Sequence, residues 1–574
     1  MYSIRLLTGE FLDVPTGLTL PYELNNQIFS TSSTDVLPGS FTFPVDLPTS
    51  DRNCRLLNHP QLVANAYNFQ EYADTSLYCH GVEIFRGTLK ILSANRQKIK
   101  ISIVAAPLSK LKNVPLNELD LGGDRSVGDT DHTLSLALDT ANHPLDFDFA
   151  FFPVLNDRFM GAQDDEDYRR NMQNHFNVDT ERFEVSHGAP NFMPFVRADY
   201  VISRIFAGIE FGFQNLFALD DERRKIYLYN NRSLWTAKGV LDPIDLRNHV
   251  PKTPAIAWLR KFMSVFCLGL FTNVFRRTIR LIPLRDLLAR PALHDWTQYV
   301  LDPVEISSAA GDIPVRINYA ESDDEAFQYG RRNVRPPVLA TFRHLEEIET
   351  STFSGTAGYF YVTSRAAYYY YDPAEITSQR YRLIYTEIGP APVREGTPSL
   401  DIDMAPLFDF WHRSDVWIAR PTNAPWGPMP MCRIPGATEY LPDGATESIR
   451  LEADIPERLM IYRGYLQDSN LKFYPMAVST PYLSLPSPPI GNVSLRLQDE
   501  LGTYNQFWSL WHQVLTKGKP VSLRLALPLS DLLAFSFEDK VTIQNIDYFV
   551  KRLQVTQALS DSRMLVEADM ISMI

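Results

Sequence analysis

One stretch of the chain, residues 256–288, limits the fold most because two hydrophobic periods follow each other in it. In its first half, apolar residues recur at the spacing of one helix face; they are Ile256, Leu259, Met263, Phe266 and Leu270. Gly269 weakens this predicted helix where the apolar run is densest. Residues 276–281 then alternate with a period of two, which predicts a strand, and Pro283 ends it because proline has no N–H to donate. A short helical turn opened by Asp286 completes a predicted unit of helix, tight reversal, strand and turn.

A similar unit precedes this one at residues 200–229. Its helix-like run is broken by Gly208 and Gly212, and alternating residues follow at 226–229. Both units place a basic pair just before the strand, Arg223-Arg224 and Arg276-Arg277. Two interpretations stay open: an internal duplication, or two unrelated α/β segments in a mixed fold.

The flanking regions have the character of β proteins. Forty prolines and an aromatic content of 12% suggest many short strands separated by turns. Residues 82–92 and 98–105 predict a hairpin with one wet face, because Ile99, Ile101 and Ile103 alternate with polar residues.

The C-terminal part is β-rich around one helix, predicted over 503–515 and stopped by Gly518. The apolar side of this helix would hold Phe507, Leu510, Trp511 and either Val514 or Leu515. Strands are expected after it, at 521–529, 540–545, 548–559 and 563–574.

Composition excludes some functions. A net charge of −13 argues against a protein that coats nucleic acid, which is usually basic. The four cysteines, at 54, 79, 267 and 432, form no CxxC pair, so we expect reduced and mostly buried thiols in a protein folded in a cytoplasm. The start of the chain does not read as a signal peptide, and the apolar run 262–275 is too short to span a membrane.

A search for chemistry yields no catalytic, cofactor-binding or metal-binding residue, and we expect a protein without enzymatic activity. The sequence has no HExxH, GxSxG, GxxxxGK[ST] or strand-linked GxGxxG motif. His80 and His187 have no second ligand at metal spacing. The acidic run 164–167 lacks the spacing of a calcium loop and is interpreted as solvated charge.

Aromatic residues gather between 358 and 426. Four successive tyrosines at 368–371 and, further on, Trp411, His412 and Trp426 fit a sugar-binding or stacking surface. Tyrosine-rich strands packed against a neighbouring subunit are the more common alternative.

Several blocks together resemble the tail hub or baseplate hub (tail tip) proteins of tailed bacteriophages, especially those infecting Bacteroidetes. The first is FTFPVDLPTSDRN with the following LLNHP, and the second is VEIFRGTLKIL. The later blocks are residues 194–231, 258–288, 501–515 and 537–555. The resemblance covers most of the chain except 113–190 and 389–435, and it rests on the order of the blocks.

The resemblance implies a structural virion protein, assembled in the host cytoplasm and located in the virion tail. It would form a homotrimeric tail hub that adapts the sixfold tail tube to a threefold central fibre or spike. Its partners would be the tail tube or distal tail protein, the tape measure protein, and the fibre or spike. DNA would pass through the lumen during ejection without specific binding, which the acidic balance favours.

The predicted fold class is therefore α+β, mostly β, with tube-like β-barrel hub domains and intervening helix–strand units that assemble as a ring. Five regions are expected: an N-terminal β-barrel hub domain (1–112), a polar insertion (113–190), a duplicated helix–strand domain (191–300), a β-rich aromatic domain with an extended connection (301–435), and a C-terminal β-rich hub domain with one helix (436–574).

Two alternatives belong to other classes. One is a receptor- or glycan-binding tail protein that uses the aromatic region 358–426, for which Tyr369 and Trp426 are the residues to substitute. The other is an enzyme that degrades cell wall or polysaccharide, which zymography on cell-wall material would detect.

Overall fold

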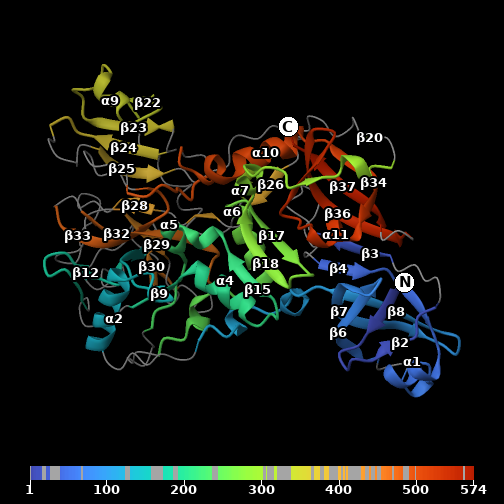
Figure 1. Ribbon diagram of the computed structural model, residues 1–574. Coiled ribbons are helices and arrows are strands. Elements are labelled where there is room, and N and C mark those ends of the chain that lie inside the picture. The colour runs from blue at the N-terminus through green and yellow to red at the C-terminus, as the bar shows by residue number, and fades with distance from the viewer. Residues whose placement is uncertain are drawn as a thin grey trace.

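The computed structural model places most of the chain. It describes residues 2–15, 21–25, 39–65, 69–122, 130–156, 172–184, 192–234, 243–301, 305–306, 316–319, 338–363, 367–374, 381–386, 399–402, 405–406, 409–411, 428–432, 438–440, 446–448, 454–467, 471–481, 490–497, 500–559 and 563–573. The fold is α+β and mostly β, as predicted, with several separate sheets and short helices between them (Figure 1).

The largest sheet has 14 strands and contains both ends of the chain. Its N-terminal strands are β1 (Tyr2–Arg5), β2 (Phe11–Leu12), β3 (Tyr22–Asn25), β4 (Gly39–Thr42), β5 (Val45–Pro48), β6 (Glu71–Cys79), β7 (Val82–Ala94) and β8 (Lys98–Ala105). Its later strands are β19 (His294–Asp295), β20 (Glu305–Ile306), β34 (Pro520–Pro528), β35 (Lys540–Ile543), β36 (Ile546–Ala558) and β37 (Arg563–Ser572). The main path runs β2-β1-β6-β7-β8-β4-β3-β36-β37-β34-β20.

The expected closed barrels are not seen in the described residues. No described sheet closes on itself, and the N-terminal and C-terminal units instead share one open sheet. The reason lies at β3, which pairs with β4 on one edge and with β36 on the other, so it has no free edge with which to close a barrel. Alternating burial is the same in a barrel and in an open sheet, which is why the sequence pattern did not separate them.

The strands predicted for the N-terminal and the C-terminal β units are confirmed. In β8, Ile99, Ile101 and Ile103 are fully buried, while the residues between them face the other side. Helix α1 (Asp51–Leu56) follows β5 and begins at Ser50, whose side chain accepts a hydrogen bond from the backbone N–H of Asn53.

The stretch 256–288 forms helix α6 (Ala255–Val265), strands β17 (Leu268–Asn273) and β18 (Thr278–Pro283), and helix α7 (Leu284–Leu288). The one predicted strand (β18) and the final turn (α7) are confirmed, but the helix is shorter than expected and Leu270 belongs to an additional strand, β17. Cys267 adopts a positive φ of 46°, which ends the helix. Gly269 therefore lies in a strand, where a Cβ would overlap the side chains of Phe271 and Leu284.

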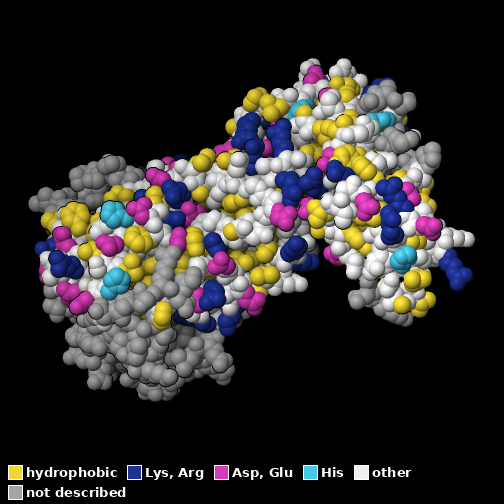
Figure 2. All heavy atoms as spheres, turned by 60° about the horizontal axis from the view of Figure 1, so that its bottom comes forward, with side chains coloured by type: hydrophobic (Ala, Val, Ile, Leu, Met, Phe, Trp, Pro, Cys, Tyr) yellow, Lys and Arg dark blue, Asp and Glu magenta, His cyan; other side chains and the backbone are white. Residues whose placement is uncertain are grey.

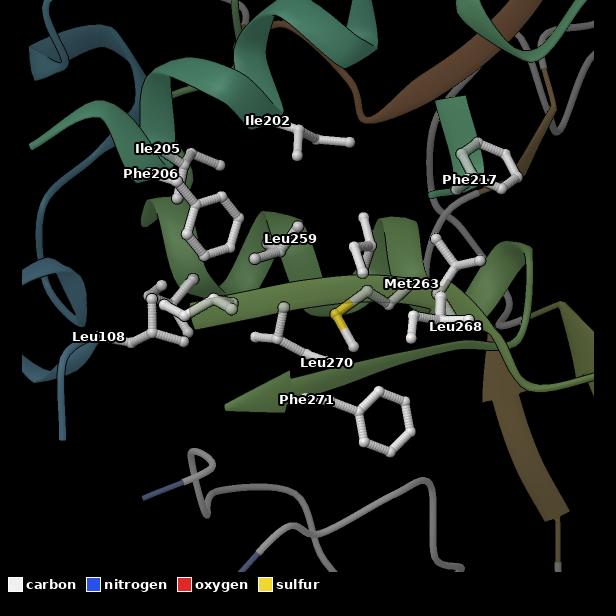
Figure 3. Close-up of a cluster of buried hydrophobic side chains, with 14 of the residues drawn as sticks. Leu108, Ile202, Ile205, Phe206, Phe217, Leu259, Met263, Leu268, Leu270 and Phe271 are labelled. Atoms are coloured by element: carbon white, nitrogen blue, oxygen red, sulfur yellow. The ribbon is translucent and has the colours of Figure 1, made fainter. Parts of the chain in front are cut away.

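The earlier unit contains α4 (Ala198–Ala207), β15 (Gly212–Asn215), α5 (Asp221–Arg224) and β16 (Ile226–Leu228). Strand β15 pairs in parallel with β18, whereas β16 pairs with β32 (Arg458–Gln467) of another sheet. The two units thus send their last strands to different sheets, and the duplication stays a prediction. Figure 3 shows how α4, α6 and β17 share one apolar cluster, formed by Ile202, Ile205, Phe206, Leu259, Met263, Leu268 and Leu270.

The region 113–190 differs from the expected polar loops where it is described. It contains helix α2 (Thr130–Asn142) and strands β9 (Phe149–Ala150), β10 (Val154–Asn156), β11 (Met172–Gln173), β12 (Phe176–Asn177) and β13 (Arg182–Phe183). Phe149, Phe151 and Phe152 are fully buried, and Phe152 stacks on Phe195 of β14 (Phe195–Val196) at 4.4 Å between ring centroids. These three phenylalanines are thus part of the protein core.

A small sheet with its own core projects from the body. Its strands are β22 (Ala340–Phe342), β23 (Gly358–Val362), β24 (Ala367–Tyr371) and β25 (Tyr381–Thr386), and helix α9 (Glu347–Thr350) accompanies them. Figure 1 shows this sheet at the opposite end of the molecule from the N-terminal strands. The five-domain division proposed from the sequence stays a prediction.

Smaller strands complete the body: β21 (Arg316–Tyr319), β26 (Ser399–Ile402), β27 (Ala405–Pro406), β28 (Asp409–Trp411), β29 (Pro428–Cys432), β30 (Thr438–Tyr440), β31 (Thr446–Ser448) and β33 (Phe473–Val478).

The C-terminal helix is confirmed with one change of register. It begins as a π-helix (Tyr504–Trp508), continues as α10 (Ser509–Lys517) and ends at Gly518, and the shorter α11 (Leu529–Ala534) follows β34. Leu510, expected on the buried side, is 46% exposed, whereas Trp508 is fully buried. A π turn has more residues than an α turn, so it shifts the side chains before α10 around the helix axis relative to those after it. A uniform α-helical period therefore mispredicts the burial of Trp508 and Leu510.

Candidate interaction surfaces

The joint between β3 and β36 unites the two ends of the chain. Tyr22 lies opposite Val555 and Leu24 lies opposite Leu553, and all four side chains are buried. The pKa of the Tyr22 hydroxyl is raised well above its usual value, chiefly because the side chain is buried. The joint is therefore a continuous part of the hydrophobic core.

The other side of the same strands carries paired charges. Arg552 contacts Glu23 at 3.5 Å and Asp569 of β37 at 2.7 Å, so it bridges a carboxylate from each end of the chain. Ser522 of β34 donates a hydrogen bond to Asp569 at 2.7 Å. We call these four residues, Glu23, Arg552, Asp569 and Ser522, the polar row. Both signs of charge alternate along it, as they do over the face of the molecule shown in Figure 2.

The β17–β18 hairpin is attached to both β units by ion pairs. At its turn, Arg277 contacts Asp74 of β6 at 3.5 Å and Glu210 at 2.8 Å. Further along β18, Arg280 contacts Glu538 at 2.6 Å, and Glu538 is 9% exposed. Arg277 of the basic pair noticed in the sequence thus ties the hairpin to β6, although no sequence pattern pointed to its acidic partners.

The tyrosine-rich strands divide their rings between two faces. Tyr369 and Tyr371 are buried with Phe360 in the core of the small sheet. On the opposite face, Tyr359 packs across the strand pair on Tyr370, with ring centroids 5.1 Å apart. Tyr361 packs on Tyr368 in the same way at 4.8 Å. Tyr368 is only 6% exposed, so within the ladder formed by these four tyrosines (359, 361, 368 and 370) it is Tyr359, Tyr361 and Tyr370, and not Tyr369, that offer a surface to a partner. Trp426 and His412 lie outside the described residues, and for Trp411 only the backbone is described.

The other residues considered for chemistry are placed apart. His80 lies in the turn between β6 and β7 with a φ of 50°, next to the buried Cys79. Cys54 and Cys267 are also buried free thiols, as expected, and burial raises the pKa of both. His187 and the acidic run 164–167 fall outside the described residues. Within the described part of the chain, no cluster of three or more His, Cys, Asp or Glu side chains could hold a metal ion.

Among the helices that the structure places, none is both long and apolar enough to cross a membrane.

Two buried polar groups were not anticipated from the sequence. Arg463 of β32, with 1% of its side chain exposed, pairs with Glu222 of α5 and donates to the backbone oxygen of Val493 at 2.7 Å. Glu222 also accepts from the backbone N–H groups of Asn492 and Val493. His249 is buried beside Asn230. These residues are far apart in the sequence, so no spacing rule would have found them.

Comparison with known proteins does not assign this chain to a family. The sequence matches no protein-family profile and no curated protein sequence. Among solved structures, the chain is similar to the 43 kDa tail protein of prophage MuSo2 from Shewanella oneidensis. The two are 6% identical, the alignment covers 99% of this chain and 95% of that chain, and the TM-score is 0.30. A similarity of this size does not establish a shared fold.

Proposed function

We propose that this protein is a structural component of a bacteriophage tail, and specifically a homotrimeric hub at its distal end. The hub would adapt the sixfold tail tube to a threefold central fibre or spike and form part of the DNA channel. Its partners would be the tail tube or distal tail protein, the tape measure protein, and the fibre or spike protein. In this proposal the chain has no catalytic role and acts in the virion tail after assembly in the host cytoplasm.

The observation that carries the proposal is the joint between β3 and β36. Each chain contributes an N-terminal and a C-terminal β unit, and these units are fused into one sheet. Three copies would present six such units, which is the number needed to meet a sixfold ring. The order of the sequence blocks gives independent support. Among the described strands, none pairs with the outer edge of β2 or β20, and such edges would let the sheet pair with neighbouring copies.

The test is the solution mass of the purified protein, measured together with negative-stain images of the same fractions. A mass of about three times 65.6 kDa, with a threefold ring around a central hole, is expected. A protein that stays monomeric and forms no ring, even when mixed with its tail tube protein, would contradict the proposal. A ring with another number of subunits would contradict the threefold part alone.

The polar row supplies a second readout of the same proposal. Suppose that the face carrying the polar row lines the channel. In the assembled ring, the cysteine of Ser522→Cys should then be labelled by a small maleimide. It should not be labelled by a maleimide attached to a polymer that is wider than the central hole. Leu7→Cys, at a side chain that is 70% exposed away from this row, is the matched control. Equal labelling of both positions by the wide reagent would place the polar row outside the channel.

The tyrosine ladder favours one alternative function, binding of a receptor or a glycan. Its rings lie on the face opposite the core of a sheet that projects at one end of the molecule (Figure 1). Binding on a glycan array that is lost in Tyr359→Ala or Tyr370→Ala would favour this function. An array without signal, or a signal that survives both substitutions, would count against it.

A further inference from the structure

The hairpin β17–β18 lies beside the junction of the N-terminal β unit (β1 to β8) and the C-terminal β unit (β34 to β37). In Figure 1 it points toward this junction, and its ion pairs reach both units. The joint itself consists of four residue pairs, from Tyr22 opposite Val555 to Asn25 opposite Arg552. The twist between neighbouring strands varies widely among sheets. A joint this short therefore does not by itself determine the angle between the two units.

The hairpin is attached to the N-terminal unit at its turn. Arg277 contacts Asp74 at 3.5 Å and Glu210 at 2.8 Å, and its guanidinium carbon lies 5.5 Å from the ring centre of Phe211. Arg277 and Asp74 each have a φ of 50°, in the left-handed region that favours glycine. Asp74 lies at the bulge that shifts the pairing of β6 with β7. The attraction between the two side chains opposes the backbone cost of these positions.

The hairpin is attached to the C-terminal unit further along β18. Arg280 donates to Glu538, the second residue before β35, at 2.6 Å and to the side-chain oxygen of Gln214 at 2.9 Å. Arg290 lies 3.9 Å from the other carboxylate oxygen of Glu538. Glu538 is 9% exposed, and a carboxylate buried to this extent depends on its positive partners. Salt should therefore screen this contact less than the one at Asp74, whose side chain is 29% exposed.

We propose that the hairpin β17–β18 is a strut that fixes the angle between the N-terminal and C-terminal β units. The two units meet at the joint, and the hairpin contacts one unit at Asp74 and the other at Glu538. These three contacts form a triangle, so the angle between the units cannot change unless one contact breaks. The role of the strut in a ring rests on the function proposed above, because six units around one axis must be evenly spaced.

The test is the distance between two nitroxide spin labels, one on each unit, measured by pulsed electron paramagnetic resonance in the full-length protein. The labels are attached to Leu7→Cys and Ile546→Cys, at side chains that are 70% and 41% exposed. Labelled chains are diluted in unlabelled protein, so that the distances are read within one chain. Protein without these two substitutions gives the background from the native thiols.

Two double variants break the attachments from opposite sides. Arg277→Gln with Arg280→Gln removes the charges of the hairpin. Asp74→Asn with Glu538→Gln removes those of the two units, and asparagine tolerates the left-handed backbone at position 74. Lys252→Gln is the matched control, because its ion pair with Asp454, at 3.8 Å, joins segments outside both units.

We expect a narrow distance distribution in the parent and in Lys252→Gln, and a several-fold broader one in both double variants. Hydrogen exchange in β7 and β36 that matches the parent shows that both units stay folded. Raising sodium chloride from about 0.1 M to about 1 M should broaden the parent distribution in part, through the contact at Asp74. An unchanged distribution in a folded double variant, or equal broadening in Lys252→Gln, would overturn the strut. If both double variants unfold, a parent distribution that does not respond to salt would overturn it.

Ring formation is scored separately on the same samples. A parent protein that forms no ring, but whose distances broaden in the double variants, would contradict the hub and support the strut. Unchanged distances in a protein that forms threefold rings would contradict the strut alone.

Discussion

At the scale of single residues, the fold depends on a few buried polar groups with specific partners. His249 is the clearest case. It is buried, and its Nδ1 lies 3.0 Å from the amide nitrogen of Asn230, which donates to it. Burial, followed by the charge of Arg232, lowers the pKa of His249 from its ordinary value to about 4. The ring is therefore neutral in the folded protein at neutral pH.

This pKa leads to a prediction about stability. Between pH 6.5 and about 4 the unfolded chain binds a proton at His249 that the folded chain does not, so stability should fall as the pH drops through this window. The loss approaches about 1.4 kcal/mol per pH unit. Denaturant unfolding of wild type and His249→Asn at pH 7 and pH 5 measures it, because Asn keeps an acceptor and does not titrate. An equal pH dependence in both proteins would refute the assignment to His249.

The two faces of the tyrosine-rich sheet lead to a second prediction at this scale. Tyr369→Ala should lower the free energy of unfolding of the small sheet by about 3–5 kcal/mol, since it removes a buried aromatic ring. Tyr359→Ala, on the opposite face of the same sheet, should cost clearly less because its ring is only half-buried. Hydrogen exchange in β23 and β24 reports the difference. Equal loss of protection in the two variants would show that both faces are core.

The tyrosines of the small sheet and Leu510 show how far the burial of single residues can be predicted from sequence. The sequence placed the aromatic residues in strands, and period-two alternation would assign them to two faces, yet it did not say which face was buried. That choice depends on α9 and Leu345, which cover one side of the sheet. Leu510 was misplaced for a different reason, because a local π turn cannot be seen in the composition of a helix.

At the scale of elements, the hairpin β17–β18 shows what the sequence missed. Its second strand was predicted from the alternation at 276–281, but the first part of β17 was assigned to the preceding helix because Leu268, Leu270 and Phe271 continue the apolar run of that helix. A fully buried strand and a buried helix have the same hydrophobicity, and only length and flanking residues separate them. The helix end at Cys267 is set by tertiary packing and carries no glycine signal.

Gly269 makes this interpretation testable. Gly269→Ala should destabilise the hairpin by about 1–3 kcal/mol, because its Cβ would overlap the side chains of Phe271 and Leu284 in a filled core. Gly212→Ala, in β15 of the same sheet, is the control, since its Cβ would meet no atom closer than 3.9 Å. Thermal melting of the two variants compares them. A Gly269→Ala protein as stable as the control would mean that Phe271 and Leu284 can move to accommodate the added methyl group at little energetic cost.

At the scale of the whole molecule, the sheet shared by the two chain ends is the main result. Sequence patterns identified its longer strands, β7, β8 and β34 to β37, because alternation is a local property. They did not reveal that β3 would pair with β36, since register between distant strands depends on which edges meet in space. The expectation of two separate barrels was wrong for the described residues for this reason.

The joint can be broken on purpose. Leu24→Pro removes a backbone donor from a strand that is paired on both edges, so protection against hydrogen exchange should fall in β36 as well as in β3 and β4. The hairpin β17–β18, in another sheet, should keep its protection. Leu24→Val is the control because it retains the donor. A loss of protection confined to β3 and β4 would mean that β36 keeps its hydrogen-bonded structure without β3.

The same joint has a consequence for how the chain is made. Tyr22 leaves the ribosome long before Val555, so β3 has one unpaired edge while the chain between them is made. Contacts between such distant residues form slowly, and an open strand edge in the meantime is a site for pairing with other chains. The N-terminal unit therefore stays incomplete until β36 has been made. For this protein, the rate of synthesis and the access of chaperones to β3 should decide the yield of folded molecules.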